Sequence, residues 1–181
     1  MHLELDEIGA GGIVREYSVA AETFPELLAI AEAAQFDFST LLEFQLRLQR
    51  VGTLVVLDGQ LTFGIKNMCG RCLDPFDLKI ESSFALTFTP RKETSAEQEI
   101  EELELEDEEL GLVYYEDERL DLLIPLQEQV VVSLPISPLC DEACRGLCPE
   151  CGMNLNKTSC SCEKKIFNNK FASLGKLKID S

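Results

Sequence analysis

The chain of 181 residues lacks the residues and motifs that several large classes of enzyme need. Its single histidine, His2, stands in a terminal segment where we expect a surface residue, so a Ser-His-Asp type of hydrolytic site has no support. The sequence also has neither a P-loop nor the glycine motif of dinucleotide-binding folds. These absences leave hydrolytic catalysis without support and remove the usual nucleotide-binding motifs.

Long apolar segments are absent as well, because no apolar run approaches the roughly 20 residues that a membrane helix needs. The acidic N-terminal segment 1–7 has no apolar core of a secretory signal. We therefore expect no membrane partner and a cytoplasmic location. Disulfides are rare in that reducing compartment, and paired cysteines there more often bind metal.

Positive charge is scarce, since 16 basic residues oppose 33 acidic ones and give a formal net charge of −17. The deficit is uneven: residues 143–181 hold seven basic and three acidic residues, a net +4, which leaves −21 for residues 1–142. So acidic a body repels phosphate backbones. Any contact with RNA should come through the C-terminal segment or through a protein partner, although acidity also serves solubility alone.

Alternating apolar residues predict strands through the middle of the chain. Ile13–Val19, the alternation from Phe44 to Leu48, and Phe76–Phe88 each have the period of a half-buried strand. Asp58-Gly59 lies between the apolar runs 54–57 and 61–65, which is a two-residue hairpin signal. The pattern predicts an α+β fold with a mostly antiparallel sheet, arranged as a meander with one buried face.

Three segments have helical patterns. Thr23 and Glu26 have capping-box spacing before an apolar stripe that ends near Ala34. Asp121 could cap a helix with Pro125 in its first turn, although the β-branched run 130–132 leaves a strand as the alternative. Residues 167–177 could form a short terminal helix.

The composition divides the chain into three parts. Residues 1–92 form the β-rich core with one helix, and residues 93–118 form an acidic, self-repelling linker. Residues 119–181 hold a helix, a cysteine-rich segment like a zinc ribbon, and a basic tail that packs back on the core.

The eight cysteines fall into four close pairs. Cys148, Cys151, Cys160 and Cys162 make a compact C-x2-C-x8-C-x-C set, in which Pro149 and Gly152 favour the tight turn of a metal knuckle. Such a pair places two sulfurs on one side of a turn, as a tetrahedral ion with metal–sulfur bonds of ~2.3 Å requires. The spacing predicts a closed, structural zinc site.

The other four cysteines, Cys69, Cys72, Cys140 and Cys144, could make a second zinc site if the segment around Leu139 folds back onto the loop at Cys69. A mixed allocation of the eight ligands, an iron–sulfur cluster and a disulfide knot remain alternatives. Thioredoxin-like chemistry at Cys69 and Cys72 is another alternative, but it would place the first cysteine at a helix N-terminus. Here the pair lies between predicted strands.

Several of these segments occur in the order found in one known family. The strings are Met68–Leu73 (MCGRCL), Asp121–Leu123, Leu134–Cys140 (LPISPLC), Cys144–Asn156 (CRGLCPECGMNLN), Cys160–Cys162 and Asn169–Leu174. This order resembles the bacterial YceD family, named for large-ribosomal-RNA-subunit accumulation, which also has plastid members. The family often carries a proline where Asn169 stands. Some members lack the second knuckle and keep the early Cys-x-Arg-Cys.

The resemblance implies a factor, not an enzyme, for the maturation or accumulation of large-subunit ribosomal RNA. Its partners would be that RNA or its precursor, or a large-subunit ribosomal protein. An acidic protein–protein adaptor that docks a basic partner is the alternative, and an oxidoreductase is a third. The candidate contacts with RNA or a partner are Arg71, Arg145, Lys157, Lys164, Lys165 and Lys170. Arg71 could equally form a salt bridge with the acidic surface.

Overall fold

The computed structural model describes residues 1–91, 112–116 and 118–162. A six-stranded sheet has the order β2-β4-β5-β6-β7, with β3 paired to β5 beside this path. Neighbouring strands are antiparallel except β6 and β7, so the predicted α+β fold with a mostly antiparallel sheet is confirmed. The strands are β2 (Ile13–Val19), β3 (Asp37–Phe38), β4 (Leu42–Val51), β5 (Leu54–Met68), β6 (Pro75–Pro90) and β7 (Leu112–Tyr115).

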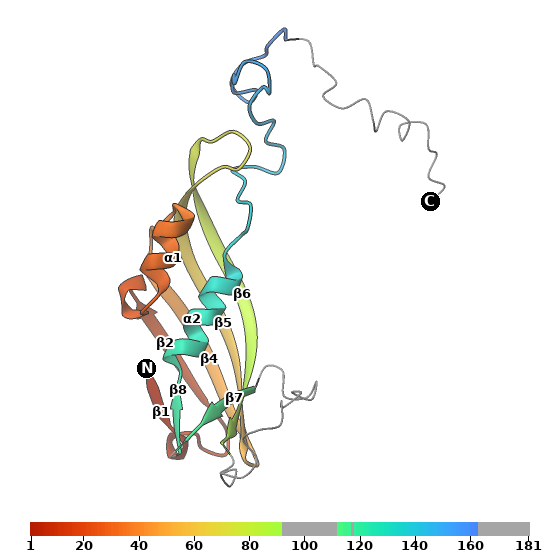
Figure 1. Cartoon of the computed structure of the whole chain (residues 1–181). Helices are drawn as coiled ribbons and strands as arrows, with labels where there is room; N and C mark the ends of the chain where they lie inside the picture. The colour runs from red at the N-terminus through yellow and green to blue at the C-terminus, as the bar shows by residue number, and fades with distance from the viewer. Residues whose placement is uncertain (92–111, 117, 163–181) are drawn as a thin grey trace, which may run out of the picture.

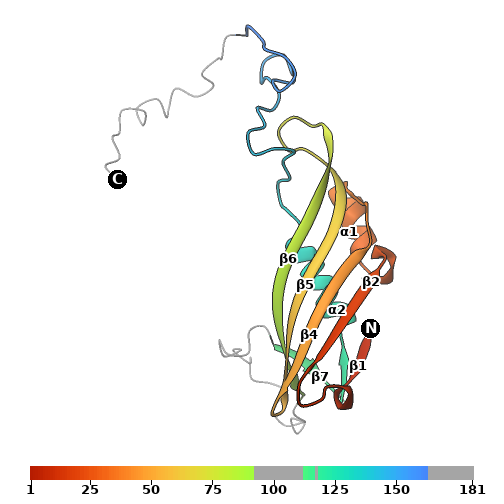
Figure 2. The same cartoon turned by 180° about the vertical axis from the view of Figure 1, so that it is seen from behind.

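Two α-helices, α1 (Leu27–Ala34) and α2 (Leu123–Ser133), cover one face of this sheet (Figures 1 and 2). A small two-stranded sheet of β1 (His2–Glu4) and β8 (Arg119–Asp121) lies near the start of α2. Single 3-10 turns form at Leu5–Glu7 and Ala21–Thr23. No helix in the described parts of the chain has the length and apolar character to cross a bilayer.

The core lies between the sheet and the helices, and it follows the alternation in the sequence. On β4 the buried residues are Leu42, Phe44, Leu46 and Leu48, and their neighbours between them are exposed. On α2 the positions Leu126 and Val130 are fully buried, whereas Val132 is 79% exposed. This spacing is helical, so the predicted helix is confirmed and the alternative of a strand at 130–132 is wrong.

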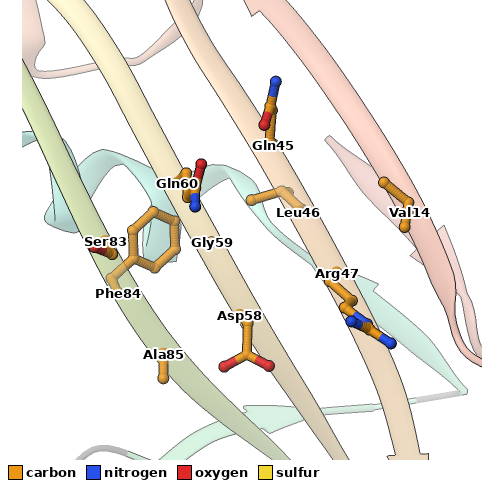
Figure 3. Close-up of a pocket in the computed structure, with 10 residues that line it drawn as sticks. All are labelled: Val14, Gln45, Leu46, Arg47, Asp58, Gly59, Gln60, Ser83, Phe84 and Ala85. Carbon is orange, nitrogen blue, oxygen red and sulfur yellow. The ribbon is translucent and has the colours of Figure 1, made fainter.

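The predicted hairpin at Asp58-Gly59 is wrong, because β5 continues through both residues. The turn lies earlier, at Gly52 (φ +65°) and Thr53, between the paired residues Val51 and Leu54. Gly59 serves packing instead: it pairs with Phe84, and a Cβ atom at position 59 would overlap the Phe84 ring (Figure 3). Asp-Gly is a common turn dipeptide, but here the glycine is explained by its close contact with Phe84 on the neighbouring strand.

The predicted helix start at Thr23 is also wrong. Residues Ala21–Thr23 form the 3-10 turn, and α1 begins at Leu27 without a side-chain cap. The Glu26 backbone N–H donates to Oε1 of the buried Gln127 on α2, at 3.2 Å. A distant side chain therefore satisfies a donor near the start of the helix, for which the sequence predicted a local cap.

Residues 112–115, which we predicted as the end of the acidic linker, form β7 and pair in parallel with the end of β6. The remainder of that linker up to residue 111 lies outside the described residues, as does the predicted helix at 167–177. The division of the chain into three parts therefore stays a prediction.

Candidate metal centres

The loop between β5 and β6 holds Cys69 and Cys72 in a tight turn. The Cys69 backbone N–H donates to the carbonyl of Asp74 at 3.0 Å, and the Leu73 N–H donates to the carbonyl of Cys69 at 3.0 Å. Leu73 adopts a left-handed φ of 57°, which turns the chain back toward β6. Both cysteines are buried.

The segment after α2 folds back onto this loop, which is the condition that the second cysteine site required. The Gly70 N–H donates to the carbonyl of Pro138 at 2.8 Å, which brings the next cysteines into reach. Cys69, Cys72, Cys140 and Cys144 then gather with all four sulfurs within 4.8 Å of one another. We call this group the hairpin tetrad.

The second group, which we call the ribbon tetrad, consists of Cys148, Cys151, Cys160 and Cys162, again with sulfurs within 4.8 Å. The knuckle closes through the Gly152 N–H, which donates to the carbonyl of Cys148 at 2.9 Å. Gly152 has a φ of +71°, so its predicted left-handed conformation is observed. Cys148 is buried, and the other three sulfurs belong to half-buried or exposed residues.

The sulfur spacing fits one tetrahedral ion. The Sγ atoms of Cys69 and Cys144 are 3.7 Å apart, and so are those of Cys72 and Cys140. Metal–sulfur bonds of about 2.3 Å at tetrahedral angles place sulfurs about 3.8 Å apart. A disulfide requires about 2.05 Å, so neither of these two pairs is disulfide-bonded. All eight cysteines are free in the structure. The two tetrads are thus consistent with two metal sites.

Backbone N–H groups aim at the sulfurs and change their acidity. The Cys140 N–H is the main group that lowers the pKa of Cys69 to about 6, and the N–H groups of Cys151 and Glu150 lower that of Cys148 to about 6. Hydrogen bonding to Cys69, followed by burial, raises the pKa of Cys140 to about 12, and hydrogen bonding to Cys151, followed by burial, raises the pKa of Cys162 to about 12. Without metal, each tetrad therefore retains protons at neutral pH. A metal would displace them, so its affinity should rise with pH.

Two asparagines that the sequence did not single out connect the tetrads. The Asn156 side chain donates from Nδ2 to Cys144 Sγ at 3.2 Å and accepts at Oδ1 from the Arg145 N–H at 2.7 Å. The Asn154 amide donates to Asp74 Oδ2 at 2.8 Å. Because both asparagines lie inside the loop of the ribbon tetrad, they hold that loop against the hairpin tetrad. The sequence feature that could have indicated this role is the string Asn-Leu-Asn between the two ligand pairs of the ribbon tetrad.

Arg71 also joins the loop between β5 and β6 to the cysteine-rich segment, so its side chain has a structural role. Its Nη1 donates to the carbonyls of Glu142 (3.0 Å) and Cys144 (3.1 Å), and its own carbonyl accepts from the Leu147 N–H at 3.1 Å. Gly146 (φ +70°) packs so closely that a Cβ atom there would lie 3.0 Å from the Arg71 carbonyl oxygen. The guanidinium contacts backbone carbonyls, and the salt bridge that we considered does not form within the described residues.

The other basic candidates differ in their surroundings. Lys157 forms an ion pair with Asp74 at 2.9 Å, whereas Arg145 is exposed and its side chain makes no hydrogen bond or ion pair within the described residues. Lys164, Lys165 and Lys170 lie outside the described residues. Their roles in binding a partner stay predictions.

Other possible sites offer less chemistry. His2 is a half-exposed residue 3.6 Å from Asp121. Cys69 lies between strands, away from any described helix N-terminus, which leaves thioredoxin-like activation without its usual support. A shallow hollow on the uncovered face of the sheet is bordered by the polar side chains of Gln45, Arg47, Asp58 and Gln60 (Figure 3).

We predict two bound metal ions per chain by elemental analysis. The double variants Cys69→Ser/Cys72→Ser and Cys160→Ser/Cys162→Ser should each retain one, because each removes half of a single tetrad. Ser161→Ala, which lies between two ligands and supplies none, should retain two. Fewer than two ions in the unaltered chain, or one double variant without effect, would contradict the allocation.

We further predict that Asn156→Ala weakens metal binding at the hairpin tetrad by about 10- to 100-fold, the usual effect of losing a group that hydrogen-bonds a ligand. Competition with a chromophoric chelator measures this affinity. Thr158→Ala is the control, since this exposed side chain bonds only the Asn154 carbonyl. Equal affinities of the two variants would show that the Asn156 contact does not matter.

Comparison with known proteins places these groups in a family. A family model described as "Large ribosomal RNA subunit accumulation protein YceD" matches residues 57–178, which include both tetrads. An uncharacterized protein of Mycobacterium tuberculosis is 35% identical over 130 residues, covering 72% of this chain and 56% of the relative. An uncharacterized protein of Mycobacterium leprae is 27% identical over 139 residues, covering 74% and 58%.

A plant relative matches over a longer stretch. The "Large ribosomal RNA subunit accumulation protein YCED homolog 1, chloroplastic" of Arabidopsis thaliana is 24% identical over 201 residues, which cover 96% of this chain and 60% of the relative. The chain thus spans little more than half the length of these relatives. No solved structure is significantly similar to it. Since the family match extends over both cysteine clusters and most of the chain, the chain belongs to the YceD family.

Proposed function

We propose that both tetrads bind zinc and that the zinc is structural. Four cysteine sulfurs leave no open coordination position for a substrate or water, and their close spacing fits a single ion. An iron–sulfur cluster separates its ligands by a core of several atoms, so it would need a wider arrangement. A structural ion would stabilise a segment that has little regular secondary structure after α2.

We also propose that the protein promotes the maturation or accumulation of large-subunit ribosomal RNA, without catalysing a reaction itself. The observation that carries this proposal is the family match across both tetrads. The zinc-bound segment stands beyond the end of the sheet (Figures 1 and 2), where it is free to meet a large partner. The eight free thiols suit a reducing compartment, and we propose the cytoplasm.

The basic tail is the RNA-binding surface that we favour. Arg71 and Lys157 are engaged within the protein, and the uncovered sheet face carries no aromatic side chain for base stacking on its described central strands. Arg145 is exposed beside the tetrads, and Lys164, Lys165 and Lys170 follow them in the sequence. Of the six basic candidates, Arg71 and Lys157 are the two whose side chains make contacts within the described residues.

We predict that replacing Lys164, Lys165 and Lys170 together with Glu weakens binding to precursor large-subunit RNA. Losing up to three phosphate contacts should also reduce the slope of log affinity against log salt by roughly 2. The control variant replaces Arg47, Arg50 and Lys66 with Glu, because these three cations are exposed on strands β4 and β5, away from the tail in the sequence. Filter binding over a range of salt measures both quantities, and unchanged binding by the tail variant would reject this surface.

A protein adaptor is the second candidate, and the charge of −21 over residues 1–142 favours it. An acidic body could dock a basic ribosomal protein through electrostatic complementarity. Capture of partners with and without ribonuclease separates the two candidates. Retention of ribosomal protein after RNA digestion would favour the adaptor, and its loss would favour direct RNA binding.

A further inference from the structure

Strand β6 has a long uncovered edge. One of its sides pairs with β5 from Pro75 to Phe88. On its other side β7 pairs only with Thr87–Pro90, so no described strand covers residues 75–86. Figures 1 and 2 show β6 as the outermost strand over most of its length.

The backbone of this edge is open for hydrogen bonding. In an antiparallel sheet, alternate residues of an edge strand direct their N–H and C=O groups outward. Within the described residues, no turn, loop or side chain forms a hydrogen bond with the backbone of residues 75–86 from that side. Such an edge accepts another strand by main-chain pairing. The side chains must then decide which strand fits.

The side chains of β6 are complementary to a second copy of themselves. Within one chain Lys79 and Glu81 already form an ion pair, and both side chains are about two thirds exposed. In an antiparallel pair centred on Ile80, every Lys79 would also face a Glu81 of the other copy. The two lysines and two glutamates then alternate in sign around the centre. On the opposite face the same register places aromatic against aromatic: its pairs are Phe76 with Phe84, Leu78 with Ser82, and Ile80 with Ile80, while Asp77 meets Ser83.

Neighbouring registers are worse. A pair centred on residue 79 would oppose Lys79 to Lys79, and one centred on residue 81 would oppose Glu81 to Glu81, and like charges directly opposite are destabilising. Strand β2 forms the other uncovered edge of the sheet. An antiparallel pair of two β2 strands centred on their middle residue would oppose Glu16 to Glu16, which is again a repulsive contact. The register centred on Ile80 thus avoids the like-charge contacts of the registers centred on residues 79 and 81. A register centred on Leu78 would also oppose Lys79 to an acid, Asp77, but it would place Glu81 opposite Pro75, so the effect of Glu81→Lys separates the two.

We propose that two copies of this chain associate through antiparallel pairing of β6 with β6, centred on Ile80. The pairing joins the two sheets into one continuous sheet, with the helices of both copies on the same side. It also places the two cysteine-rich segments at opposite ends of the dimer, because the paired strands run in opposite directions. Each dimer would present two such segments to partners.

Charge reversal tests the proposal directly. Sedimentation equilibrium of the full chain over a wide concentration range, at about 150 mM salt to screen the repulsion between two copies of charge −17, measures the dimer dissociation constant. Lys79→Glu and Glu81→Lys should each weaken the dimer about tenfold or more, because two attractive pairs become repulsive. The double variant Lys79→Glu/Glu81→Lys should restore it, since the opposite charges face each other again.

Glu16→Lys on β2 is the control, because it reverses a charge at the other edge and should leave the dimer unchanged. Circular dichroism confirms that each variant is folded. A wild-type chain that stays monomeric, single variants that associate as well as wild type, or a folded double variant that fails to recover would each overturn the proposal.

Discussion

The contact between the β5–β6 loop and the segment after α2 determines how the C-terminal half of this protein is held. Cys69 and Cys72 lie on the loop, and Cys140 and Cys144 reach them across about 70 residues of sequence. Four sulfurs within 4.8 Å of one another and a backbone hydrogen bond from Gly70 to Pro138 make that contact. Closing so long a loop costs conformational entropy, and a shared metal ion would offset that cost.

The ribbon tetrad depends on this first contact. Cys144 and Cys148 are separated by only three residues, so one short stretch supplies ligands to both groups. Asn154 and Asn156 then fix the ribbon loop by hydrogen bonds to Asp74 and Cys144, and Arg71 fixes the preceding segment by hydrogen bonds to the carbonyls of Glu142 and Cys144. Arg71 and Lys157, two cations near the tetrads, therefore make contacts within the protein.

The sequence predicted the local patterns well, because they depend on periodicity and spacing. The alternation on β4, the strand β2, the helix α2 and the compact ribbon tetrad follow from rules that apply within a few residues. The hairpin tetrad joins cysteines about 70 residues apart, so the sequence offered it only on the condition that the chain folds back. The predictions were wrong where a residue distant in the sequence determines the local conformation. Phe84 requires the glycine at position 59, and Gln127 bonds the backbone of Glu26. The parallel strand β7 and the asparagine bridge also depend on tertiary contacts that no local pattern records.

Hydrogen exchange before and after removal of bound metal by a chelator tests most directly whether the tetrads hold the cysteine-rich segment to the sheet. Amides of residues 144–157 and of the Cys69 loop should lose protection, while those of β4 and the middle of β5 should keep it, because the core is packed independently of the tetrads. Unchanged protection around Leu147 and Leu155 after metal removal would show that the tetrads do not hold this segment to the sheet.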